Sequence, residues 1–138
     1  VNLMPSALWD FGLEAALKIL IRNSGLDVNF IYEKGDNIRE LGFEERICLY
    51  RIAQESLQNA LKYAEDKKVN LFIVQEEDEI KMRVEDFGVG FDPKNYLSEN
   101  KSSHGLNNMK ERINILGGSF KVSSEKGKGT KILVKLPL

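Results

Sequence analysis

The chain has 138 residues, which is long enough for one domain with a hydrophobic core and too short for two domains of ordinary size. Its 42% hydrophobic and 30% charged residues are typical of a soluble globular protein and exclude disordered and fibrous classes. The 20 basic and 21 acidic residues give a net charge of −1. This balance provides no general attraction to nucleic acid or to an anionic membrane, so we expect neither as a direct partner.

The chain carries no feature of a secreted or membrane-spanning segment. No apolar run approaches the roughly 20 residues that a transmembrane helix needs, and no secretory signal opens the sequence. The single cysteine, Cys48, excludes an internal disulfide and a multi-thiolate metal site. We therefore expect a cytoplasmic location. Because the first residue is Val1 rather than Met, we also expect the chain to be a piece of a longer protein.

The spacing of apolar residues predicts helices and strands in alternation. Helices are expected at residues 10–23 and 44–64, and from about residue 106 to a stop at residues 117–118. Strands are expected around residues 28–32, at 69–75 and 79–86, and in a final hairpin around 120–122 and 132–136. The polar stretch at 92–104 has no periodicity and is expected to be a loop. Together these elements predict one domain, a sheet with helices on one face.

The long predicted helix has two different faces. Its broad face is mainly apolar and contains Ile47, Tyr50, Ala53, Leu57, Ala60, Leu61 and Ala64. Glu55, Asn59 and Lys62 lie on the other side, within about 60° of one another. They could act as a base, a ligand for a hard cation and a phosphate contact, or they could form a solvated face with an ion pair. Cys48 and Ile52 share that stripe, which is therefore not simply solvated.

Asp86 ends a predicted strand and shares a face with the apolar residues Met82 and Val84. Burial of an unpaired carboxylate costs several kcal/mol, so Asp86 should have a donor partner, and the amino group of a ligand would serve. Gly88 and Gly90 follow closely and allow a sharp turn and the close approach of a flat ligand. The alternative is an ordinary strand end with a turn-forming Asp and Gly pair.

A third group of residues follows the predicted loop. Gly105 precedes the expected start of a helix, where free backbone N–H groups favour an anion such as phosphate. Thr130 falls on the same face as Ile132, so its hydroxyl also points inward. The structural alternatives are a helix start at Gly105 and a hairpin turn at residues 127–129. His104 lies in the predicted loop. A histidine in a loop is usually solvated, and the alternative is that His104 contacts phosphate.

The order of these motifs resembles the ATP-binding catalytic domain of sensor histidine kinases, which belong to a wider superfamily with gyrase and the mismatch-repair ATPases. The resemblance covers nearly the whole chain. Three boxes carry it: an N box at Glu55-x-x-x-Asn59-Ala60-x-Lys62, a G1 box at Asp86-x-Gly88-x-Gly90-Phe91 and a G2 box at Gly105-Leu106. The subfamily of the nitrate and lipid-fluidity sensors is indicated by Met4-Pro5, by Gly12-Leu13 and by Met109 and Arg112.

The resemblance implies a fold and a domain plan. The fold would be the Bergerat ATP-binding fold, a two-layer α+β sandwich with a mixed sheet of about five strands and about three helices on one face. Residues 26–138 would form the ATP-binding catalytic domain. Residues 1–25 would form a junction and the first helix of that same domain.

The resemblance also implies ATP and Mg²⁺ as cofactors and a role for each motif residue. Asp86 would accept the adenine amino group. Asn59 would supply an oxygen to Mg²⁺, Glu55 would polarise the acceptor or attacking group, and Lys62 would contact phosphate. The remaining nucleotide-binding residues would shape the adenine wall and the lid, and they are Gly88, Gly90, Phe91, His104, Gly105, Leu106 and Thr130.

The implied function is donation of the ATP γ-phosphate to a histidine on an upstream dimerisation domain, for relay to a response regulator. That histidine is missing from this chain, and His104 is no substitute. The chain alone is therefore expected to be a monomer that binds Mg·ATP and hydrolyses it slowly at best. The parent is expected to be a homodimer, and an inner-membrane anchor on the parent is compatible with this hypothesis.

Two other functions fit the same residues. One is a serine protein kinase of the anti-sigma type with the same fold. The segment from Met4 to Leu13 argues against this function, because the segment looks like a junction to an upstream helical hairpin. The other is a non-catalytic nucleotide-sensing domain, against which the intact Glu55 and Asn59 argue.

The chain departs from the family pattern at Tyr63, where histidine is usual, and at Phe87, where a small or polar residue is common.

Overall fold

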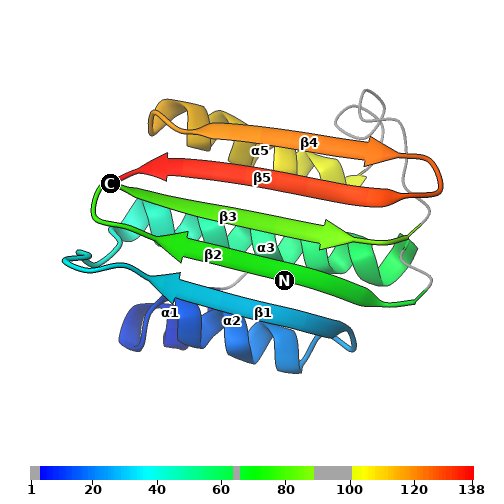
Figure 1. The fold of residues 1–138 in the computed structure, drawn as a ribbon, viewed down its shortest axis with the longest axis horizontal. Coiled ribbons are helices and arrows are strands. Elements are labelled where there is room, and N and C mark those ends of the chain that lie inside the picture. Colours follow the sequence, from blue (N-terminus) through cyan, green and yellow to red (C-terminus); the bar gives the residue numbers. More distant parts are fainter. Residues whose placement is uncertain (1–3, 64–65, 89–100) are drawn as a thin grey trace.

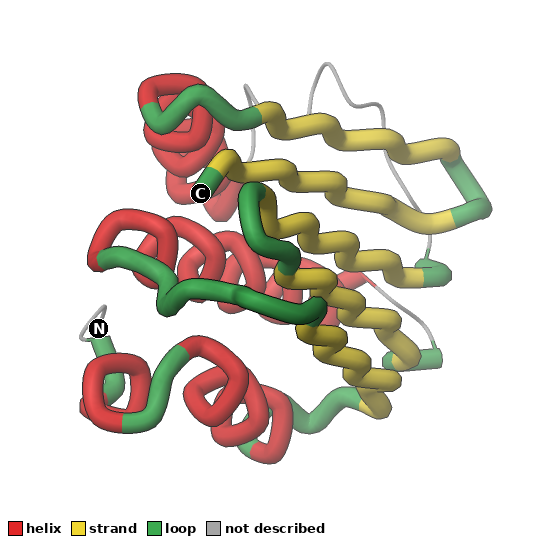
Figure 2. Tube along the Cα trace, turned by 60° about the vertical axis from the view of Figure 1, so that its left-hand side comes forward, coloured by secondary structure: helices red, strands yellow, loops and turns green. Residues whose placement is uncertain are grey.

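The computed structural model describes residues 4–63, 66–88 and 101–138, which form helices packed on one sheet. The helices are α1 (Ser6–Asp10), α2 (Leu13–Arg22), α3 (Phe43–Tyr63) and α5 (Lys101–Ile115). The strands are β1 (Asp27–Lys34), β2 (Lys68–Gln75), β3 (Glu79–Asp86), β4 (Ser119–Glu125) and β5 (Gly129–Pro137). These helices all lie behind the sheet in Figure 1, and Figure 2 shows the two layers from the side. The predicted two-layer α+β fold is confirmed.

The strands form one mixed sheet in the order β1-β2-β3-β5-β4. β1 and β2 are parallel, and the chain passes between them through α3. Such a crossover is needed because a tight turn can join only antiparallel strands. The other neighbouring strands are antiparallel. Their register places Asp86, the last residue of β3, opposite Thr130 near the start of β5.

The core lies between the sheet and the helices. Alternate residues of β2, β3 and β5 are buried, as the period-2 pattern predicts, because successive side chains of a strand point to opposite faces. The fully buried core includes residues from α1 and α2 as well as from the sheet. Its largest members are Leu8, Leu17, Leu49, Ile52, Leu71, Ile73, Ile80, Met82, Ile113 and Leu136. The N-terminal helices therefore share one hydrophobic core with the remainder of the described chain.

Helix α3 is buried on more sides than the sequence predicts. Besides the sheet, α2 and α5 also pack against it. Cys48 and Ile52, which the pattern placed on the polar stripe, are therefore 0% exposed. The buried face is shifted toward α5, so Leu61 on the opposite margin is 44% exposed, and its predicted burial is wrong. Ala64 lies outside the described residues.

The predicted helix at residues 10–23 is present as α2, but it begins three residues later than expected, at Leu13. A short helix that was not predicted, α1, precedes it, and Phe11 and Gly12 separate the two helices. Gly12 has φ +93°, a left-handed value that breaks the helix and that glycine adopts readily. The apolar positions are still correct, because Leu13, Ala16 and Leu17 are buried.

The boundary before α5 also differs from the prediction. The loop was expected to extend to His104, but the helix begins at Lys101, so residues 101–104 are helical. Apolar periodicity cannot detect a polar first turn, and these four residues contain no helix breaker. Residues 92–100 lie outside the described residues. Among the described helices, none is long and apolar enough to cross a membrane.

Candidate functional site

The predicted site residues gather at one end of the sheet. Asp86 ends β3, Thr130 stands beside it on β5, and Figure 1 shows the C-terminal half of α3 reaching the same end. Around the two strands, a hollow of about 330 Å³ is lined by Asp86, Phe87, Ser124 and Thr130, among others. Strand pairing and the antiparallel hairpin thus bring together residues that lie 44 positions apart in the sequence.

Asp86 is a half-buried carboxylate held by the backbone. The N–H of Gly88 donates to its Oδ1 over 3.1 Å, and the backbone N–H of Thr130 also donates to the carboxylate. Burial raises the pKa of Asp86 above its ordinary value of 3.8, while the two hydrogen bonds act in the opposite direction and the charge of Asp66 raises it further. The donors that the sequence analysis required for Asp86 are therefore supplied in part by the main chain.

Thr130 is only 8% exposed, and its hydroxyl is paired with Ser124. The two Oγ atoms are 3.0 Å apart, and the Ser124 hydroxyl also donates to the carbonyl of Gly129 over 3.1 Å. Because a serine hydroxyl has only one proton, Thr130 is the donor to Ser124. The lone pairs of the Thr130 oxygen thus remain available as acceptors beside Asp86. Ser124 was not predicted, although the alternation along β4 places it on the same face as Phe120 and Val122 and places Ser123 on the other face.

Gly129 controls how closely β5 approaches β3 at this point. It has φ +91°, and a Cβ built on it would collide with the carbonyl oxygen of Asp86. Any side chain here would therefore push the two strands apart. The sequence predicts a hairpin turn at this glycine, and the turn is present, with the N–H of Lys128 donating to the backbone carbonyl of Glu125 over 2.9 Å. The second role of Gly129, as the close contact of Asp86, was missed.

Helix α3 contributes a buried amide and a half-buried carboxylate. Asn59 is 5% exposed, and its Oδ1 accepts no hydrogen bond within the described part of the chain, although the residue has another interaction. Burial raises the pKa of Glu55 above 4.5, and the charges of Arg51 and Lys62 act in the opposite direction. Lys62 is exposed. At the N-terminal end of α3, the Glu45 carboxylate caps the helix by accepting a hydrogen bond from the N–H of Gly42 over 3.1 Å.

Helix α5 runs antiparallel to α3 and brings its N-terminal end toward Asn59. Arg112, near the C-terminal end of α5, pairs with Glu44 at the start of α3 over 3.4 Å, and Figure 1 shows the other end of α5 on the same side of the molecule as the C-terminal end of α3. Gly105 lies in the second turn of α5, and the predicted position at the helix start is wrong because the helix begins four residues earlier. Its N–H therefore falls within the hydrogen-bonding pattern of the helix. Leu106 and His104 belong to the same helix, while Gly90 and Phe91 lie outside the described residues.

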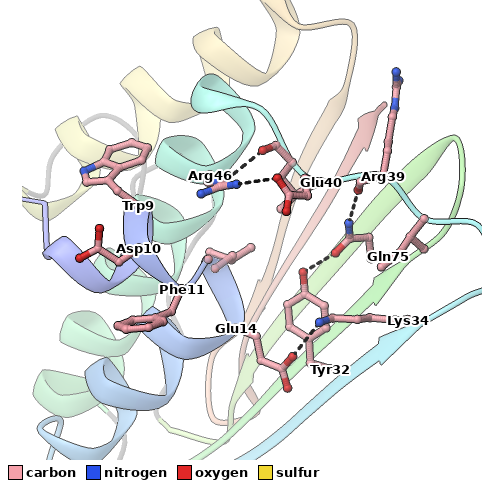
Figure 3. Close-up of a pocket in the computed structure, with 14 residues that line it drawn as sticks. Trp9, Asp10, Phe11, Glu14, Tyr32, Lys34, Arg39, Glu40, Arg46 and Gln75 are labelled. Carbon is pink, nitrogen blue, oxygen red and sulfur yellow. Dashed lines mark hydrogen bonds and ion pairs between the residues drawn. The ribbon is translucent and has the colours of Figure 1, made fainter.

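A second hollow, of about 270 Å³, lies at the opposite end of the sheet (Figure 3). Its lining contains many polar side chains, but several of these form hydrogen bonds with one another or with the main chain. The hydroxyl of Tyr32 donates to Gln75 Oε1 over 2.6 Å, and Gln75 Nε2 donates to the carbonyl of Arg39 over 2.9 Å. Burial raises the pKa of Tyr32 to about 12. This network braces the segment around Arg39 against β1 and β2, and the sequence analysis did not predict it.

Among the described residues, no group of three or more His, Cys, Asp or Glu side chains could hold a metal ion. A metal at this site would therefore need ligands from elsewhere, such as the phosphates of a nucleotide. One or two protein oxygens together with substrate phosphates and water are the usual shell of Mg²⁺. The buried amide of Asn59 fits that shell as the protein oxygen.

Comparison with known proteins places the fold in a family. Residues 44–138 match the family described as histidine kinase-, DNA gyrase B- and HSP90-like ATPase. The chain is similar to the signal transduction histidine-protein kinase/phosphatase DegS of Bacillus subtilis, with 32% identity over 139 residues, 97% of this chain and 36% of DegS. It is also similar to the sensor histidine kinase ComP of the same organism, with 33% identity over 139 residues, 99% of this chain and 18% of ComP.

The chain thus spans about a third of one relative and less than a fifth of the other. A solved histidine kinase domain, from the blue-light activated histidine kinase of Erythrobacter litoralis EL346, has the same fold with a TM-score of 0.66 and 18% identity. The alignment covers 92% of this chain and 59% of that one. The family match covers well over half of the chain. The chain belongs to the histidine kinase-, DNA gyrase B- and HSP90-like ATPases.

Proposed function

We propose that this chain is the ATP-binding catalytic domain of a sensor histidine kinase. It binds Mg·ATP and presents the γ-phosphate to a histidine on an upstream dimerisation domain, from which the phosphoryl group passes to a response regulator. One observation carries the proposal most strongly. Asp86 is a half-buried carboxylate that two backbone N–H groups hold at a strand end, beside an acceptor hydroxyl on Thr130.

Adenine is the base that these acceptors select. The carboxylate of Asp86 accepts a hydrogen bond from the exocyclic amino group, and the hydroxyl oxygen of Thr130 accepts a further hydrogen bond, directly or through water. Guanine carries a carbonyl where adenine has its amino group, and a carboxylate repels that oxygen. The buried Gly88 leaves room for the flat base against the main chain.

The phosphates lie toward α3 and the N-terminal end of α5. Asn59 would hold Mg²⁺ together with the phosphates, and the cation would neutralise phosphate charge for transfer. Lys62, exposed at the end of α3, contacts phosphate. Gly90 and Phe91, together with His104, Gly105 and Leu106 of α5, complete the nucleotide site. Positioning and charge neutralisation are the main requirements of phosphoryl transfer, and this group of residues provides both.

Glu55 acts on the group that attacks the γ-phosphate. Its burial raises its pKa, which makes its carboxylate a stronger base than an exposed glutamate. The positive charges of Arg51 and Lys62 act in the opposite direction and favour the ionised form of Glu55. Glu55 therefore orients and polarises the acceptor histidine, or a water molecule when the acceptor is absent.

The partners follow from the relatives. DegS and ComP are named histidine kinases and are much longer than this chain. This supports the proposal that the phosphoacceptor histidine and the dimerisation helices belong to an upstream segment of a longer parent, which would be a homodimer. Residues 1–25 form the junction to that segment and part of the same catalytic domain.

Isothermal titration calorimetry of the 138-residue chain tests this function. We expect binding of ATP and ADP in the presence of Mg²⁺ and weaker binding of GTP. Asp86→Asn should weaken binding of the adenine nucleotides and should not weaken binding of GTP. Absence of ATP binding at millimolar concentration, with a folded chain by circular dichroism, would overturn the proposal.

A further inference from the structure

The outer face of the sheet, opposite the helices, is not covered by any element of the described chain. Figure 2 shows the helices on one side of the strands only. Outward side chains of a sheet with one solvated face are usually polar. Here several outward residues are apolar, and Ile31 is 42% and Leu133 37% exposed.

These apolar residues line a hollow of about 410 Å³ that crosses β1, β2, β3 and β5. Its apolar lining includes Ile31, Phe72, Val74 and Leu133. The register explains how they meet, because Ile31 lies opposite Phe72 on the neighbouring strand and Phe72 lies opposite Arg83. The guanidinium of Arg83 lies over the ring of Phe72, 4.7 Å from its centre.

The rim of this hollow carries an unusual pair of like charges. Lys81 lies directly opposite Lys135 on antiparallel strands, an arrangement that is destabilising by itself. Lys81 has a carboxylate partner in Glu79 at 3.5 Å, and Arg83 has one in Glu85 at 2.9 Å. Lys135 forms no ion pair within the described chain, although it lines the hollow. A carboxylate from outside would relieve the repulsion between the two lysines.

We propose that this hollow binds an acidic segment of a partner protein. The segment places an apolar side chain against Phe72 and Leu133 and a neighbouring Asp or Glu beside Lys135. The surface favours a protein over an anionic membrane for two reasons. First, the hollow is concave. Second, carboxylates lie beside its cationic side chains, for example Glu33 in the lining and Glu85 paired with Arg83, and a uniformly anionic membrane would repel these carboxylates.

Selection of random 12-residue peptides displayed on phage, against the immobilised 138-residue chain, tests the proposal without prior choice of a partner. We expect enrichment of peptides with an acidic residue next to an apolar one. Fluorescence anisotropy of the synthetic peptides should show binding about tenfold weaker to Lys135→Glu and to Leu133→Ser. Both residues face outward, and thermal unfolding checks that each variant is folded.

Lys121→Glu is the matched control, because Lys121 lies on the same face, opposite Leu133, but outside the hollow. Its affinity for the peptides should stay within about twofold of that of the unchanged chain. An equal loss for Lys121→Glu would overturn the proposal in favour of general charge attraction. Selected peptides that are not acidic, or that are insensitive to Lys135→Glu, would also overturn it.

Vesicles of three parts phosphatidylcholine and one part phosphatidylglycerol test the other source of negative charge. We expect no cosedimentation of the chain with them. Cosedimentation that Lys135→Glu abolishes would assign the face to a membrane and overturn the proposal. None of these measurements uses a nucleotide, so their failure is distinct from failure of the proposed kinase function.

Discussion

Gly129 lies so close to the carbonyl oxygen of Asp86 that a Cβ at residue 129 would collide with that oxygen. Its φ of +91° adds a second reason for glycine. Gly129→Ala is therefore expected to lower the free energy of unfolding through backbone strain, about 1 to 2 kcal/mol, and through the collision, about 1 to 3 kcal/mol more. It should also weaken ATP binding, because it displaces Asp86. Urea unfolding and calorimetry measure the two effects.

Gly127 provides the control for that substitution. It has φ +84°, but a Cβ there would meet no atom within 4 Å. Gly127→Ala should therefore show the backbone strain without the collision and should leave ATP affinity unchanged. Equal losses of stability in the two variants would contradict the proposed role of the contact between Gly129 and Asp86.

Asp86→Asn tests the adenine assignment by nucleotide preference. The substitution keeps the shape of the side chain and replaces one acceptor oxygen by an NH₂ donor. ATP and ADP affinity should fall by roughly tenfold or more, because a donor then faces the adenine amino group. GTP affinity should stay the same or rise. A uniform loss for all nucleoside triphosphates would count against contact between Asp86 and the base.

The same residue makes the stability of the chain depend on pH. Burial raises the pKa of folded Asp86 above 3.8, so the folded state binds the proton more tightly than the unfolded state. Its contribution to the free energy of unfolding is fully present below pH 3.8 and is lost as the pH rises through the raised pKa. We expect the stability of the unchanged chain, relative to Asp86→Asn, to fall across that window in urea unfolding. A difference that is constant with pH, or that grows with it, would contradict this assignment.

Asn59→Ala tests the metal contact. The variant loses a buried amide oxygen on α3, so the increase in ATP affinity that Mg²⁺ produces should shrink by at least about tenfold. In EDTA, the variant and the unchanged chain should bind ATP alike. Gln58→Ala, an amide removed from an exposed position of the same helix, is the control and should retain the full magnesium effect. Unchanged magnesium dependence in Asn59→Ala would reject the metal role.

Local patterns predicted those parts of the fold and site that depend on neighbouring residues. The period of two placed Thr130 on the buried face of its strand, and it placed Asp86 in register with the core. Which segments meet was implied only by the resemblance of the motif order to that of sensor histidine kinases. The burial of Cys48 was not predictable from α3 alone, because it results from packing against α5, more than 50 residues away. The partners of Gln75 and Ser124 were likewise invisible, since a single polar residue in a strand carries no sign of its contacts.

The network around Gln75 supports a last prediction, on stability at the end of the sheet far from Asp86. Gln75 is 4% exposed and joins the Tyr32 hydroxyl to the carbonyl of Arg39. Gln75→Leu removes both hydrogen bonds and should lower the free energy of unfolding by about 1 to 3 kcal/mol. ATP affinity should not change, because β2 ends here and Asp86 pairs with its opposite end, at Val69.

The double variant Tyr32→Phe with Gln75→Leu decides whether that loss comes from the hydrogen bond or from packing. Removal of both partners leaves no unsatisfied hydroxyl, so the double variant should be more stable than the sum of the two single losses predicts. Urea unfolding of the four proteins gives the coupling energy. Additive losses would mean that the Tyr32 hydroxyl finds water when Gln75 is gone, and that the network contributes little beyond its packing.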